Sequence, residues 1–177
     1  MRLPIPMLAA LALAGCTTTT DADGGDTADE ELESIAFSTG ACFGSCPVFE
    51  VEVAATGPDA YRGERFVAVK GERSFTASAA EWRAFAERLA PFRPDASVKY
   101  GHGTCDGPLA SDQPTVAITW RDADGSETTL DWYMGCRQPG LAENYDRIYE
   151  AWQELPLDDL VGTAEDRFRY EQDRPTG

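Results

Sequence analysis

The feature that most constrains the fold of this chain is a strict alternation of apolar and polar side chains that begins at residue 49. Residues 49–53 read F-E-V-E-V, and the same period of two returns over 116–121 and 128–132. This period is typical of a strand with one buried face and one face in water. Such strands need a layer that covers their apolar face, so a sheet with helices on one face is expected.

Turn and helix signals place the remaining elements. Further strands are expected at 35–37, 61–70 and 73–76. Ser78 and Glu81 have the spacing of a capping box, and the apolar positions after them repeat at helical spacing as far as Pro91. A second amphipathic helix is expected over 141–155, where Pro156 ends it.

The order of elements is therefore four strands, a helix, two strands and a helix. It predicts an α+β fold in which a mostly antiparallel sheet of about six strands carries two amphipathic helices on one face. Strands and helices do not alternate along the chain, and the sequence has no glycine-rich phosphate loop. A dinucleotide-binding fold is therefore not expected, and no cofactor is assigned.

The N-terminal segment has the pattern of a targeting signal. Arg2 precedes an apolar stretch over 3–15, which is too short to cross a bilayer as a helix. The stretch runs into L-A-G-C at 13–16, which closely resembles the lipobox of bacterial lipoproteins. The resemblance implies cleavage before Cys16, attachment of diacylglycerol to its sulfur and acylation of the new amino terminus. An ordinary signal peptide that is cut near the same place is the alternative.

The sequence divides into four segments. Residues 1–15 are the expected signal peptide, and 16–34 hold the lipidated cysteine and an acidic linker too polar to form a core. A single α+β domain is expected over 35–162, followed by a charged, flexible tail over 163–177. The expected location is the bacterial cell envelope, at the outer membrane or its periplasmic face, with the lipid anchor as the contact to the membrane.

The charge of the chain excludes one class of partner. Asp and Glu number thirty-one against fifteen Lys and Arg, which gives a net charge of −16. A nucleic-acid-binding protein needs a basic patch that releases the counterions of phosphates, so no nucleic-acid partner is expected. No serine–histidine–aspartate set and no carboxylate pair typical of a glycosidase stands out, so no catalytic residue is assigned.

Four cysteines follow Cys16, and an oxidising compartment favours disulfides between them. Four cysteines allow three pairings, and the preferred one joins Cys42 to Cys46 and Cys105 to Cys136. The first pair would close a short loop. The second would fasten a long glycine-rich loop to the segment after the last strand, and closing it contributes on the order of 3–4 kcal/mol in the chain-entropy model.

The string C-F-G-S-C-P at 42–47 is the most distinctive in the chain. It is typical of a disulfide-closed bend between two strands, in which glycine allows the turn and proline excludes helix. A redox pair is a second interpretation, although thioredoxin-like proteins use the spacing C-x-x-C. A zinc site that includes His102 and Cys105 is a third. A nucleophilic cysteine with His102, the only histidine, as its base is a fourth.

Several strings together resemble one bacterial family. A-C-F-G-S-C-P-V-F-E-V-E-V from residue 41, a Y-R-G strand and S-D-Q-P-T-V-A-I-T-W from residue 111 are similar to domain of unknown function 6438. The resemblance covers about 35–155 and implies a small secreted or lipid-anchored α+β domain, with no established activity. The insertion at 101–107 and Cys136 depart from the family pattern and are typical of an added disulfide.

These observations favour a non-enzymatic, lipid-anchored domain that binds an envelope protein or a small ligand. The alternative is a thiol–disulfide redox or metal-binding module centred on Cys42 and Cys46. The residues singled out for a functional loop are Phe43, Gly44, Pro47, His102 and Asp112. No metal ligands are assigned.

Overall fold

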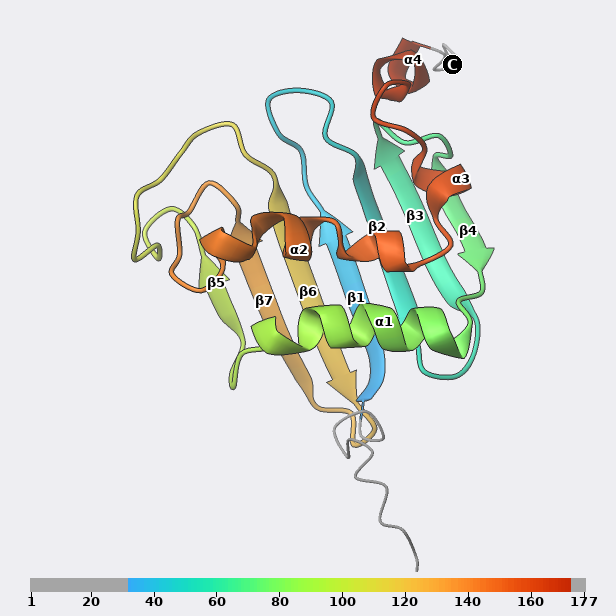
Figure 1. The fold of residues 1–177 in the computed structure, drawn as a ribbon, viewed down its shortest axis with the longest axis horizontal. Coiled ribbons are helices and arrows are strands. Elements are labelled where there is room, and N and C mark those ends of the chain that lie inside the picture. The colour runs from blue at the N-terminus through green and yellow to red at the C-terminus, as the bar shows by residue number, and fades with distance from the viewer. Residues whose placement is uncertain (1–31, 173–177) are drawn as a thin grey trace, which may run out of the picture.

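The computed structural model describes residues 32–172. The expected signal peptide, Cys16 and the linker as far as residue 31 lie outside the described residues. The described part has an α+β fold, in which one seven-stranded sheet carries a layer of helices across one face (Figure 1). The predicted fold class is therefore confirmed, and its details differ as described below.

The sheet is built around its central strand. In sheet order the strands are β4 (Gly71–Phe75), β3 (Asp59–Arg65), β2 (Val48–Ala54), β1 (Leu32–Thr39), β6 (Thr115–Asp122), β7 (Glu127–Tyr133) and β5 (Val98–Tyr100). β1 pairs antiparallel with β2 on one side and with β6 on the other. It therefore joins β2, β3 and β4 to the β6–β7 hairpin.

Helix α1 (Ala79–Leu89) runs across the sheet from the β4 side to the β5 side (Figure 1). It begins with the predicted capping box, in which the Glu81 amide donates to the Ser78 hydroxyl and the Ser78 amide donates to the Glu81 carboxylate. The other helices are α2 (Tyr145–Tyr149), α3 (Asp158–Val161) and α4 (Arg167–Gln172), with the 3-10 turns η1 (Ala90–Phe92), η2 (Ala142–Asn144) and η3 (Ala151–Glu154).

The predicted alternation decides which face of the sheet is buried. Phe49, Val51 and Val53 are at most 2% exposed, whereas Glu50 and Glu52 lie in water. The buried face packs against the apolar side of α1 and against the helical segments after β7, and together they form the core. The opposite face of the sheet is polar.

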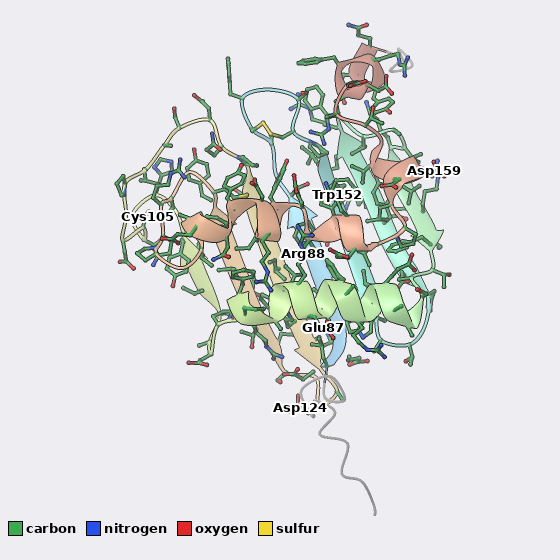
Figure 2. All side chains as sticks on the ribbon, in the orientation of Figure 1. Glu87, Arg88, Cys105, Asp124, Trp152 and Asp159 are labelled. Atoms are coloured by element: carbon green, nitrogen blue, oxygen red, sulfur yellow. A yellow bond between two sulfur atoms is a disulfide. The ribbon has the colours of Figure 1, made fainter. Side chains whose placement is uncertain are left out.

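A salt bridge joins the two parts of the helical layer. Arg88 of α1 points toward η3 (Figure 2), and its Nη1 donates to the Glu154 carboxylate at 2.8 Å. Its Nε donates to the Arg147 carbonyl at 2.8 Å. Polar contacts thus join α1 to the helical segments after β7, in addition to the apolar core that both share with the sheet.

The structure corrects the number and direction of the strands. The sequence does not predict β5, because three residues are too few to show a period of two. β5 pairs with β7 in parallel, with Val98 opposite Leu130 and Tyr100 opposite Trp132. The sheet is therefore mixed, because α1 carries the chain from one edge of the sheet to the other.

The strand expected over 61–70 ends early, at Arg65. Phe66 has a φ of 54°, which is rare for a residue with a side chain and turns the backbone out of the strand. Val67 is still fully buried, so the apolar pattern reports burial correctly although the backbone is irregular. The next strand then begins at Gly71, two residues before the expected start at 73.

The second helix, expected over 141–155, is divided into a short α-helix between two 3-10 turns. Ile148, Trp152 and Leu155 are buried as predicted. The helical period identifies the side chains that face the core, but it does not distinguish hydrogen bonds to the third residue from those to the fourth.

The ends of the domain also differ from the expected boundaries. β1 begins at Leu32, so 32–34 belong to a strand and not to the linker. Part of the expected flexible tail forms α4, where Glu171 accepts a hydrogen bond from the Phe66 amide and pairs with Lys70 at 2.9 Å. These partners lie about a hundred residues away in the sequence, so no local pattern reveals them.

Candidate functional site

Both disulfides have the predicted pairing. Cys42 is bonded to Cys46, and Cys105 is bonded to Cys136, with 5.7 Å between the Cα atoms in each case. Figure 2 shows the first bond in the loop between β1 and β2, and Cys105 in the long loop on the β5 side. Two disulfides are consistent with an oxidising compartment.

The loop between β1 and β2 is fastened at its base as well as by its disulfide. Thr39, at the end of β1, donates its hydroxyl proton to the Pro47 carbonyl at 2.7 Å, in a buried hydrogen bond. The Gly40 amide donates to the Thr115 carbonyl at 2.7 Å, which ties the loop to β6. Gly44 has a φ of 149°, which an L side chain rarely adopts.

The fastened loop presents one aromatic side chain to water. Phe43 is 87% exposed, the highest value among the exposed large apolar side chains of residues 32–172. Its amide donates to the Asp112 carbonyl at 3.2 Å, and Asp112 itself has a φ of 68°. Two of the residues singled out in the sequence are therefore in contact, although they lie sixty-nine positions apart.

His102 packs on a tyrosine at the end of β7. Its ring stacks on Tyr133 at 5.5 Å between centroids, and the Tyr133 hydroxyl donates to the Ala110 carbonyl at 2.9 Å. The Tyr145 hydroxyl donates to the Gln113 side chain at 3.2 Å, and burial raises the pKa of Tyr145. Hydrogen bonds from two tyrosine hydroxyl groups thus restrain the loop that carries Asp112.

The second disulfide belongs to the core. Cys136 is fully buried, and its carbonyl accepts a hydrogen bond from the Trp132 ring at 2.9 Å. Gln138 accepts from the Asp106 amide at 3.1 Å and donates to the Asp106 carboxylate at 2.8 Å. At Gly107 a Cβ atom would lie 2.1 Å from a backbone oxygen, so only glycine fits. This region is fixed by contacts of its own.

A shallow depression lies beside the base of the first loop, on the polar face of the sheet. It has a volume of about 280 Å3, and Ser38, Gly40, Thr115, Glu50 and Glu64 are among its residues. Its small side chains lie on β1 and β6, and its two carboxylates lie on the neighbouring strands β2 and β3. Sequence reasoning misses this site because the outward positions of single strands do not show which strands become neighbours.

The zinc interpretation is wrong for the described residues, because Cys105 is bonded to Cys136 and offers no thiolate. Residues 32–172 contain no group of three or more His, Cys, Asp or Glu side chains placed to hold a metal ion. In the same range no helix combines the length and apolar character needed to span a bilayer.

Comparison with known proteins finds one family. The model of the family described as Domain of unknown function (DUF6438) matches residues 33–152, which include both disulfides and the Phe43 loop. The search of curated proteins and the search of solved structures find no match.

Proposed function

The chain belongs to the family Domain of unknown function (DUF6438), and we propose that it is a lipid-anchored envelope domain that binds another protein through Phe43. The proposal rests on one observation, the 87% exposure of an aromatic ring on a loop that a disulfide and a buried hydrogen bond both restrain. A ring that contributes nothing to the core of its own domain is available to a partner.

The restraint on the loop favours tight binding. Burying a phenylalanine side chain in a partner yields about 1.5–3 kcal/mol, and a loop that is ordered beforehand loses little entropy on association. Aromatic side chains of this kind are common among the few residues that dominate an interface.

The direction of β1 supports a partner other than the membrane. The strand runs from Leu32 to Thr39, so the loop lies roughly 23 Å from the start of the described chain at the usual rise per residue. If Cys16 carries the lipid, as the lipobox resemblance implies, Phe43 follows the anchored residue by twenty-seven positions and lies beyond the full length of β1. We therefore expect its partner to be a protein within the envelope.

The charges around the loop favour a basic partner. Glu50 and Glu64 line the depression at the base of the loop, and Asp112 lies beside Phe43. We expect an apolar pocket with basic residues at its rim, because complementary charges speed association and exclude wrong partners.

Site-specific photocrosslinking tests the proposal. A photoreactive phenylalanine analogue replaces Phe43 in the full chain, and Phe168, which is 60% exposed on α4, carries it in a matched control. We expect one crosslinked protein from position 43 alone, and weaker crosslinking at high salt. Equal crosslinking from both positions, or none from position 43, contradicts the proposal.

Two further variants separate the parts of the proposal. Cys16→Ser should remove the protein from the detergent phase of an extraction, and a wild-type chain that is already absent from that phase contradicts the anchor.

The redox alternative predicts that the variant with serine at both Cys42 and Cys46 loses its thiol–disulfide activity, whereas Phe43→Ala keeps it. The binding proposal predicts that Phe43→Ala loses its binding to the partner.

A further inference from the structure

A second depression lies on the helical side of the molecule, between η3 and the segment that leads into α4. Its volume is about 620 Å3, within the range of small-molecule sites, and its residues include Tyr149, Trp152 and Arg167. Trp152 lies at the centre of the helical layer in Figure 2. The depression is separate from the Phe43 loop, and Arg167 lies outside the 33–152 range that the family model matches.

Two residues that line the depression each carry a buried polar atom that has no partner. Within residues 32–172, the Tyr149 hydroxyl and the Arg167 Nε are the buried side-chain nitrogen and oxygen atoms that lack a hydrogen bond. A buried donor left unpaired costs about 1–3 kcal/mol, so native proteins rarely leave one without a reason. Both unpaired groups belong to residues of the same depression.

Other half-buried guanidinium groups of the chain are paired. Arg88 pairs with Glu154 at 2.8 Å, and Arg93 pairs with Asp122 at 2.6 Å. Arg167 is therefore an exception in a protein that offers a large excess of carboxylates. A carboxylate of a ligand would pair with this guanidinium through two parallel hydrogen bonds.

The Tyr149 hydroxyl suits the same ligand. Burial raises the pKa of Tyr149 to about 12, with Arg167 acting in the opposite direction. The hydroxyl is therefore neutral at ordinary pH and can donate a proton to an anionic oxygen.

Two carboxylates complete the depression. Glu150 and Asp158 both line it, as Arg167 does. With a net charge of −16, the protein repels small anions at long range. A ligand that carries a carboxylate together with an ammonium group has no net charge and matches both kinds of side chain.

We propose that this depression binds a small zwitterion with the chemistry of an amino acid or short peptide. Arg167 and Tyr149 hold its carboxylate, and Glu150 and Asp158 receive its ammonium group. The inference does not depend on the proposed role of Phe43.

Calorimetric titration of the full chain tests this inference. The probes are alanine, dialanine, acetate, methylamine and inorganic phosphate. We expect alanine or dialanine to bind at least tenfold more tightly than the single-charge probes and phosphate, and the tighter of the two distinguishes an amino-acid site from a peptide site.

Variants of the lining residues make the test specific. Arg167→Gln should weaken the binding of the zwitterion at least tenfold, and Tyr149→Phe should weaken it severalfold. Arg169→Gln is the matched control, because Arg169 pairs with Asp166 on the surface, and it should bind as the wild type does. Circular dichroism and the Tm establish that each variant is folded.

Three outcomes overturn the inference. The first is that neither zwitterion gives a heat of binding at a ligand concentration about tenfold above a millimolar Kd. The second is that phosphate binds as tightly as dialanine. The third is that folded Arg167→Gln and the wild type bind the zwitterion equally. Crosslinking through Phe43 is unaffected by Arg167→Gln in any case, so failure here is distinguishable from failure of the proposed function.

Discussion

The two disulfides close loops at the same end of the sheet, but the loops differ in what surrounds them. Cys136 is fully buried, and its neighbours Trp132 and Gln138 hydrogen-bond to the backbone around it. Cys42 and Cys46 are only partly buried, in a loop whose most prominent side chain is in water. The Cys105–Cys136 disulfide reinforces packing, whereas the Cys42–Cys46 disulfide restrains a surface.

The difference shows that a disulfide does not by itself indicate a functional site or a structural one. Around Cys105–Cys136, apolar burial and hydrogen bonds would hold much of the arrangement without the bond between the sulfur atoms. Around Cys42–Cys46, the described hydrogen bonds are two at the base, one to Asp112 and one within the loop, from the Gly44 amide to the Cys42 carbonyl. The conformation of the exposed tip therefore depends more on its disulfide than that of the buried loop does.

The largest expected effect is that of Cys105→Ser with Cys136→Ser. These cysteines lie 31 positions apart, and opening a loop of that length lowers the free energy of unfolding by on the order of 3–4 kcal/mol. Urea denaturation followed by tryptophan fluorescence measures the loss. A loss smaller than that of the other cysteine pair would contradict the comparison.

Cys42→Ser with Cys46→Ser should have a smaller effect. The two cysteines lie four positions apart, and the same model gives about 2 kcal/mol for a ring of that size. We expect crosslinking from position 43 to weaken even where the domain remains folded. Unchanged crosslinking in this variant would show that the two hydrogen bonds at the base of the loop are enough to order its tip.

Thr39→Val removes the hydrogen bond at the base of the first loop and keeps the shape of the side chain. The Pro47 carbonyl then has lost its donor, and the expected loss of unfolding free energy is about 1 kcal/mol. Thr119→Val on β6 is the control, because its hydroxyl pairs with that of Thr129 on the polar face of the sheet. A greater loss in the control contradicts the assignment.

Phe43→Ala should have the smallest effect on stability. The ring is in water, so the free energy of unfolding should change by less than about 0.5 kcal/mol. Phe49→Ala, on the neighbouring strand, empties a core position that is 2% exposed and should cost about 3–5 kcal/mol. A thermal unfolding scan compares the two, and a clear loss in Phe43→Ala would mean that the ring supports the loop and is not free for a partner.

Particular residues show how far the sequence is predictive. The capping box at Ser78 and Glu81 was readable because its partners lie three positions apart. The pairing of the cysteines followed from their positions between expected strands. The contact of Phe43 with Asp112, and the depression that joins Tyr149 to Arg167, were not readable, because each depends on segments that meet only in the folded sheet.

The sequence by itself determined the α+β class, the buried side of each long strand, the α1 cap and the likeness to a lipobox, since each of these depends on residues a few positions apart. Only the tertiary structure decided that β5 pairs in parallel, that α4 lies against the β3–β4 connection, and that Phe43 stands free while Cys136 is enclosed. Those outcomes depend on the sum of many weak contacts between distant segments, and no local pattern of side chains encodes that sum.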